Sequence, residues 1–348
     1  MIKRILYTLL IMFPVVASAQ INTDRVMAIG RNALYFEDYV LSIQYFNQVI
    51  NAKPYLSDPY FYRGLAKINL DDFQGAESDC SEAIERNPFV VSAYQVRGLA
   101  RIQQNNFAGA IEDYTKALEF DPENIGVWHN MALCRIRQED YKGAKNDLDK
   151  LIAISPRYTK AYLMRGEVDL KQKDTLAAEK DFGKAIEIDR YDADTWASRA
   201  ILRLQQQRYK DAEADFDHAI RLSTRNSGVY INRALARYHQ NNLRGAMSDY
   251  DIALDIDPNN FIGHYNRGLL RAQVGDDNRA IQDFNFVIEM EPDNMMAIFN
   301  RGLLLDQTGD YKGAIKDYST VINEYPNFLL GYQYRAQARS CLLYTSPS

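Results

Sequence analysis

A proline returns every 34 residues along most of this chain, and this period limits the fold to a stack of similar units. The prolines on the grid are Pro54, Pro88, Pro122, Pro156, Pro258, Pro292 and Pro326, and Arg190 and Thr224 occupy its two vacant positions. A Gly or Ala stands ten residues after each grid position, and an Ala column follows twelve residues later, from Ala76 to Ala314. Such a period indicates a solenoid whose 34-residue units each hold two short helices.

Residues 57–90 illustrate one unit. The apolar and aromatic run Tyr60–Ile68 predicts a helix with a broad buried face, and Asn69–Asp72 is a polar break that suits a tight turn. Apolar residues recur at helical spacing over Phe73–Ile84, which predicts a second helix. Pro88 ends that helix, because proline cannot continue the hydrogen-bond ladder.

Six positions of this unit carry residue types that match the motif of a known repeat family. Those positions are Tyr60, Gly64, Phe73, Ala76, Ala83 and Pro88. In kind and order they resemble the tetratricopeptide repeat, and the resemblance extends over about 320 of the 348 residues. It implies an all-α fold, a right-handed superhelical solenoid of antiparallel helix pairs.

The grid divides the chain into nine repeat units and one terminal helix. The array is expected over residues 20–340, with units that start near residues 23, 57, 91, 125, 159, 193, 227, 261 and 295 and a last helix near 329. We expect that last helix to end near Arg339. Residues 341–348 fit no column and are interpreted as an atypical tail, either a true short terminus or non-native sequence.

Residues 1–19 have the layout of a cleavable secretory signal. Lys3 and Arg4 precede a brief apolar stretch, and Ala17-Ser18-Ala19 supplies small residues before Gln20. The alternative is an uncleaved anchor, although the apolar stretch is short for a membrane span. We therefore expect an exported bacterial protein of the periplasm or envelope, with no integral membrane span after cleavage. Loss of Lys3 and Arg4 takes the formal net charge from -5 to -7, which argues against nucleic acid as a partner.

Neither the cysteines nor the histidines are arranged for chemistry. Cys80 and Cys134 lie two units apart in helices, so we expect two core thiols and no disulfide. The four histidines fall in four different columns, and none has a second His or Cys nearby at metal-ligand spacing. No phosphate-binding glycine loop is present. The sequence therefore predicts a protein that is not an enzyme and has no cofactor or metal.

Two charged columns follow the repeat. One holds Arg63, Arg97, Arg165, Arg199, Arg233, Arg267, Arg301 and Arg335, with Met131 as the exception; the other runs from Asp79 to Asp317. The columns are either a charged binding stripe or a ladder of structural ion pairs, and the second reading is favoured because buried charges must be paired. The sequence does not decide whether each Arg pairs within its own unit or with a neighbouring one.

The resemblance places a peptide-binding groove on the first helices. Its candidate residues are Asn130, Asn232, Asn266, Asn300, Ile231, Tyr265 and Phe299. A row of asparagines can donate to and accept from a peptide backbone, as in related repeat proteins, and the apolar residues beside them suit a binding hot spot. The alternative is that these asparagines only cap or solvate the helices. The absence of Lys from the neighbouring column argues against a clamp for acidic chaperone tails.

These observations predict an exported scaffold that binds a protein or peptide of unknown identity in the groove. An alternative is the repeat region of a longer multidomain envelope protein, whose catalytic or wall-binding part is absent. A third possibility is self-association through an uncapped C-terminal end, because the last helix of a solenoid has no neighbour to cover its apolar flank.

Overall fold

The computed structural model describes residues 22–223 and 225–345. In this part of the chain it contains nineteen α-helices and no strand, so the prediction of an all-helical array is confirmed. The predicted signal segment lies outside the described residues. The chain divides into two compact units, Met1–Pro156 and Arg157–Ser348, which we describe one at a time.

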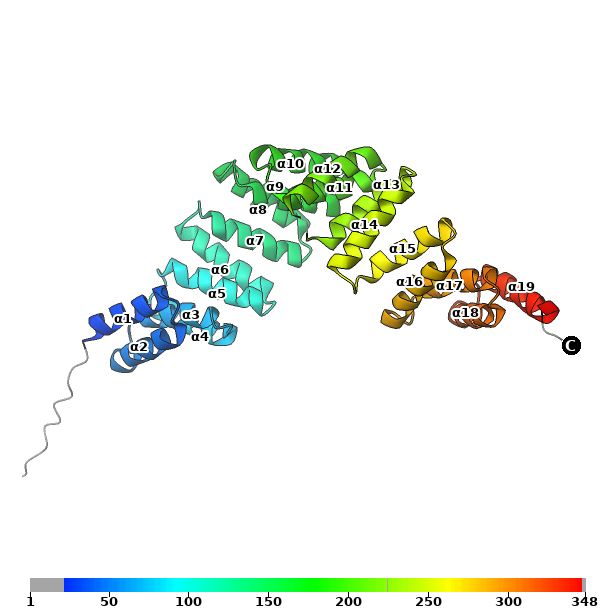
Figure 1. Cartoon of the computed structure of the whole chain (residues 1–348). Coiled ribbons are helices and arrows are strands. Elements are labelled where there is room, and N and C mark those ends of the chain that lie inside the picture. Colours follow the sequence, from blue (N-terminus) through cyan, green and yellow to red (C-terminus); the bar gives the residue numbers. More distant parts are fainter. Residues whose placement is uncertain (1–21, 224, 346–348) are drawn as a thin grey trace, which may run out of the picture. The chain divides into compact units, whose positions relative to one another are not determined.

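The first unit contains four helix pairs, coloured blue to cyan-green in Figure 1. In chain order they are α1 (Thr23–Tyr35) with α2 (Tyr39–Ala52), α3 (Asp58–Ile68) with α4 (Phe73–Arg86), α5 (Val91–Gln103) with α6 (Phe107–Phe120), and α7 (Ile125–Arg137) with α8 (Tyr141–Ile154). Within the unit, each pair packs against the next one along the chain, so that consecutive pairs stack in sequence order.

The second unit contains five helix pairs and a final helix. They are α9 (Thr159–Lys171) with α10 (Thr175–Ile188), α11 (Ala193–Gln205) with α12 (Tyr209–Leu222), α13 (Ser227–His239) with α14 (Leu243–Ile256), α15 (Phe261–Gln273) with α16 (Asp277–Met290), α17 (Met295–Gln307) with α18 (Tyr311–Glu324), and α19 (Leu329–Thr345). The helix α19 packs against α18 and continues to Thr345. It therefore runs beyond Arg339, where the repeat columns stop, and includes the first residues of the expected tail.

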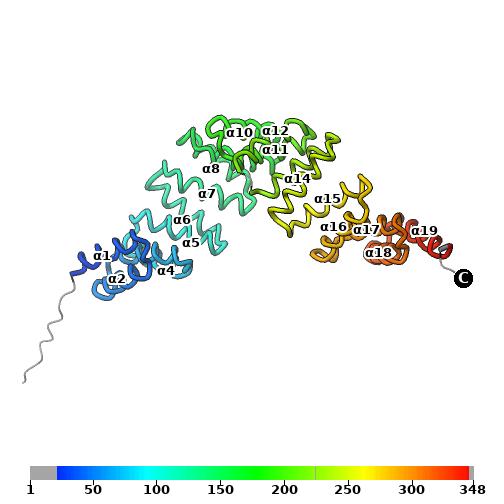
Figure 2. Tube along the Cα trace, viewed as in Figure 1, coloured from blue at the N-terminus to red at the C-terminus, as the bar shows by residue number. Residues whose placement is uncertain are grey.

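Each helix pair is joined by a tight turn that reverses the Cα trace (Figure 2), and these turns share one backbone feature. One residue per turn is left-handed, with φ between 59° and 89°. These residues are Glu37, Asp71, Asn105, Glu139, Lys173, Gln207, Asn241, Gly275 and Gly309. In the second turn, the N–H of Asp72 donates to the Lys67 carbonyl at 3.0 Å and closes α3, while Asp72 Oδ1 accepts from the Gly75 N–H at 2.9 Å and caps α4.

The second helices that precede the two vacant proline positions end in the usual column. The helices α10 and α12 end at Ile188 and Leu222, in the same columns as the second helices that a proline follows. Asp189 takes an extended conformation (φ -133°, ψ 102°), and its Oδ1 accepts from the Tyr191 N–H at 2.9 Å. An Asp side chain that bonds the backbone two residues on stabilises such a turn without proline.

Small residues on the first helices allow the partner helices to approach closely. A Cβ added to Gly98 would lie 2.8 Å from the Tyr114 ring, and one added to Gly166 would lie 2.6 Å from the Phe182 ring. Cys80 and Cys134 are buried free thiols in separate core clusters, as the sequence predicts. Burial raises the pKa of Cys80 to about 12 and that of Cys134 to about 11, which makes both thiols poor nucleophiles.

No helix within residues 22–223 and 225–345 combines the length and the apolar character that a bilayer crossing needs.

Candidate functional site

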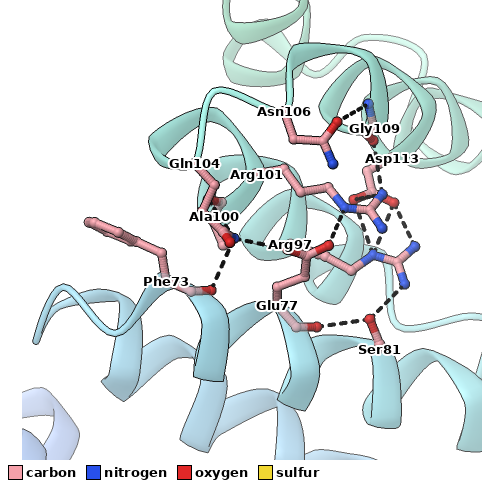
Figure 3. A network of polar contacts seen from close by, with 10 residues as sticks. All are labelled: Phe73, Glu77, Ser81, Arg97, Ala100, Arg101, Gln104, Asn106, Gly109 and Asp113. Carbon is pink, nitrogen blue, oxygen red and sulfur yellow. Dashed lines mark hydrogen bonds and ion pairs between the residues drawn. The ribbon is translucent and has the colours of Figure 1, made fainter.

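In seven repeats the column arginine pairs with the column aspartate of the same repeat. Arg97 Nη2 donates to Asp113 Oδ1 at 2.6 Å, and its Nη1 donates to Ser81 Oγ of the preceding repeat at 3.1 Å (Figure 3). The equivalent pairs are Arg63–Asp79, Arg165–Asp181, Arg199–Asp215, Arg233–Asp249, Arg267–Asp283 and Arg301–Asp317. The aspartates are buried, so these columns hold the helices together and do not form a charged binding stripe.

Three histidines have structural contacts. His264 lies 3.0 Å from both Asp283 Oδ1 and the Pro258 carbonyl, while His218 and His239 stack on Trp196 and Tyr209. In the described part of the chain, no three His, Cys, Asp or Glu side chains gather in a way that could hold a metal ion.

The predicted asparagine row lies on successive first helices of the second unit. Asn232, Asn266 and Asn300 come from α13, α15 and α17, and all three are half-buried. Asn300 Nδ2 donates to the Tyr265 hydroxyl at 3.1 Å, whereas the side chains of Asn232 and Asn266 bond no described residue. Asn130 is also half-buried but belongs to α7 in the first unit. The row therefore has three members in one unit.

Ile231 differs from its expected role. It is only 7% exposed and lies in the core cluster of α13, α14 and α15, with Tyr250 and Leu270. Its Cδ1 fills the space beside Gly263, where a Cβ would meet it at 3.4 Å. Because Gly263 has no side chain, Ile231 packs in the core, and Ile231 is too buried to contact a ligand.

Tyr265 and Phe299 line two adjacent apolar hollows. One hollow of about 230 Å³ is bounded by Phe299, Met296, Phe328 and Asn294, and a second of about 230 Å³ by Tyr265, Ile262, Phe261 and the same Met296 and Asn294. The first lies between α17 and the end of α18 with its following loop, and the second lies between α15 and the start of α17. We call them the apolar hollows.

The residues that sequence reasoning missed are Ile262 and Met296, which are 51% and 65% exposed. The signal was present as an i, i+3, i+7 pattern. In α15 this pattern reads Ile262, Tyr265 and Leu269, and in α17 it reads Met296, Phe299 and Leu303. In each of the seven preceding first helices, at least one of the three corresponding positions holds a Gly, a Ser or a charged residue. Only α15 and α17 among those nine helices carry three large apolar residues there.

Profile comparisons identify these helix pairs. Profiles described as "TPR repeat" and "Tetratricopeptide repeat" match residues 98–134, 125–158, 159–192, 198–261 and 265–327. The chain belongs to the tetratricopeptide repeat family. Proteins built of tetratricopeptide repeats are generally non-enzymatic scaffolds.

Solved structures share the tetratricopeptide repeat fold. A tetratricopeptide repeat protein from Parabacteroides merdae aligns with TM-score 0.55 and 21% identity, over 72% of this chain and 98% of that one. The C-terminal part of a TPR repeat-containing protein from Cytophaga hutchinsonii aligns with TM-score 0.58 and 16% identity, over 69% and 98%. No curated protein sequence matches the chain. At these identities the likeness supports the fold alone.

Proposed function

We propose that this protein is an exported, non-enzymatic scaffold that binds a peptide segment of another protein on the first-helix face of α15 and α17. The observation that carries the proposal is the pair of apolar hollows, which share Met296. The tetratricopeptide repeat fold supports protein or peptide binding in general, and this proposal adds the place where the peptide binds.

The size and lining of the hollows favour side chains of a peptide over a small molecule. Each hollow is about 230 Å³, below the range of roughly 300–1,000 Å³ typical of small-molecule pockets. Met adapts its shape to different partners, and exposed aromatic residues are enriched at binding hot spots. Two adjacent hollows therefore suit two apolar anchors on one peptide.

The asparagines beside the hollows can hold the peptide backbone. Asn266 has a free amide, and a peptide N–H and C=O could bond its oxygen and nitrogen. Asn300 already donates to Tyr265, which orients the tyrosine ring at the edge of one hollow. We assign Asn266 to backbone contact and Asn300 to positioning of Tyr265.

Export rests on residues 1–19. The short positive segment, the apolar stretch and Ala17-Ser18-Ala19 support cleavage before Gln20 and a place in the bacterial periplasm or envelope. The check is N-terminal sequencing of the protein from fractionated cells. A first residue of Gln20 in the periplasmic fraction supports export, and an intact Met1 in the cytosol contradicts it.

Peptide selection on the full chain tests the groove. A displayed random-peptide library should yield binders with two apolar anchors, and Ile262→Glu and Met296→Glu should each weaken them more than tenfold by charging the apolar hollows. Leu176→Glu is the matched control, since Leu176 is 80% exposed on α10 and lies outside both hollows. The proposal would be wrong if the selected peptides bound both variants with unchanged affinity, or if the library yielded no binders.

A second role, self-association through α19, is favoured by its exposed apolar side chains. Leu329 is 80%, Leu343 80% and Tyr344 92% exposed. Sedimentation velocity over a hundredfold concentration range checks this role. A dimer that Leu343→Glu dissociates supports it, and a monomer throughout contradicts it.

A further inference from the structure

A polar pocket lies on the second unit, away from the apolar hollows. It has a volume of about 600 Å³ and forms between α10 and α12, beside the N-terminal half of α11. Its lining includes Gly183, Arg190, Trp196, Arg199, His218 and Arg221, and we call it the arginine pocket. Three of these residues depart from their repeat columns.

Gly183 leaves a guanidinium nitrogen of Arg199 without an acceptor. In other repeats the residue at this position accepts a hydrogen bond from Nη1 of the column arginine, at 2.6–3.2 Å. These acceptors are Asn47, Ser81, Asp217, Asp251, Asn285 and Ser319. Arg199 Nη1 meets only Gly183 there and bonds no described residue, while a Cβ on Gly183 would touch nothing within 4 Å. The missing side chain thus opens the pocket and frees a donor.

Two more arginines supply positive charge. Arg190 takes the place of the grid proline, and Arg221 stands in a column that is otherwise mostly acidic, as in Glu85, Glu119, Glu187, Asp255 and Glu289. Neither arginine forms an ion pair with a described residue. The one carboxylate in the lining, Glu187, is paired with Lys184 Nζ at 2.9 Å.

The framework beneath the pocket holds Arg199 in place. Asp215 accepts from Arg199 Nε and Nη2, both at 2.8 Å, so Nη1 is the donor that remains. The Arg199 guanidinium also lies 5.0 Å from the Trp196 ring centre, and the His218 imidazole stacks on the same ring at 4.3 Å. Trp196 Nε1 donates to the Arg190 carbonyl at 3.0 Å and ties the junction loop to the same framework. A fixed donor flanked by two free guanidiniums is pre-organised for an anion.

We propose that the arginine pocket binds a small ligand that carries two or more oxyanion groups, carboxylate or phosphate. Guanidinium groups match the planar geometry of both groups and bind them with paired hydrogen bonds. The pocket volume lies in the range of small-molecule sites and exceeds what a single oxyanion needs. The site is local, because the chain as a whole carries a formal net charge of -5.

Isothermal titration calorimetry of the full chain with pyrophosphate and with citrate tests the proposal. We expect at least one probe to bind, with affinity that falls as NaCl is raised to 0.5 M. Gly183→Asn should weaken binding more than tenfold without lowering the thermal midpoint, because Asn fills the pocket and bonds Arg199 as Asn47 bonds Arg63. Arg221→Glu, which copies the acidic residue of the neighbouring repeat, should do the same.

The control is Arg244→Glu, an equal charge change at an exposed position of α14 outside the pocket, which should leave affinity unchanged. Pyrophosphate alone identifies a phosphate ligand, citrate alone a carboxylate ligand, and binding of both a pocket that selects charge. Equal affinity in all four proteins, or no binding of either probe at millimolar concentration, overturns the proposal. Peptide selection on the apolar hollows is independent of this result.

Discussion

Arg135 Nε donates to Asp147 Oδ2 at 2.7 Å, and Arg135 is the one described residue that bonds this buried carboxylate. In several other repeats two cations, one of them the column arginine, meet the aspartate. Asp249, for example, accepts from both Arg233 and Arg237. The repeat of α7 and α8 lacks the second cation because Met131 stands in the arginine column. Burial raises the pKa of Asp147 to about 6, and the Arg135 guanidinium offsets this rise only in part.

This raised pKa predicts a pH dependence that Met131→Arg removes. The folded state holds the Asp147 proton to higher pH than the unfolded state, so the free energy of unfolding falls as pH rises from about 4 to 6 and then stays level. An arginine at 131 would ion-pair with Asp147 and lower its pKa. We expect the variant to gain about 2 kcal/mol over the parent above pH 6 and much less at pH 4.

Urea unfolding of both proteins between pH 4 and 8 measures the difference, and Met131→Leu is the apolar control. A gain that does not change with pH would contradict the role assigned to Asp147.

Removal of one column aspartate should be costly. Asp249→Ala leaves Arg233 and Arg237 without the carboxylate that both bond, and we expect a loss of about 3 kcal/mol. Asp251→Ala is the matched control, since Asp251 is 50% exposed and its pair with Arg267 should contribute less than about 1 kcal/mol. Chemical denaturation monitored by circular dichroism compares the two. Similar losses would mean that burial of Asp249 does not set the strength of the pair.

The left-handed turn residues predict a stabilising substitution. Gln207 has φ 61°, which strains any residue with a Cβ, so Gln207→Gly should raise the free energy of unfolding by about 0.5–1 kcal/mol. Gln206→Gly is the adjacent control: its φ of -79° carries no such strain, so glycine there should only add unfolded-state entropy and destabilise. Thermal unfolding of both variants distinguishes backbone strain from a general effect of glycine.

Close helix packing predicts that the same substitution destabilises the protein at one glycine and not at another. Gly166→Val would drive a side chain into the Phe182 ring, 2.6 Å from the position of Cβ, and should cost about 2 kcal/mol. Gly183→Val meets open space in the next helix and should cost nothing. Equal thermal midpoints for the two variants would contradict the close contact at Gly166.

Much of the fold could be predicted because it depends on the spacing of residue types along the chain. The 34-residue proline grid, the small-residue column that includes Gly98 and the Ala column each reflect a packing requirement that recurs in most repeats. A requirement repeated at one fixed period is visible in a single sequence, and the family and the all-helical fold follow from it. The same argument accounts for the buried thiols of Cys80 and Cys134.

The candidate sites were predicted less well, because they depend on what lies opposite a side chain. Ile231 and Tyr265 occupy the same column of the repeat, but Ile231 packs in the core beside Gly263 and Tyr265 lines an apolar hollow. The column position alone does not distinguish these two environments. The exposed Met296 was not predicted as a binding residue, because an apolar residue in a helix is normally assigned to the core when the positions of its neighbours are unknown.

By itself, the sequence determined the repeat length, the order of helices and which residues share a column, because each of these depends on spacing along one chain. The tertiary structure alone decided that Arg97 pairs within its own repeat and reaches Ser81 with its remaining donor. It also decided that the donor of Arg199, which faces Gly183, is left free. Both results depend on distances between helices, and these distances exist only after the helices pack.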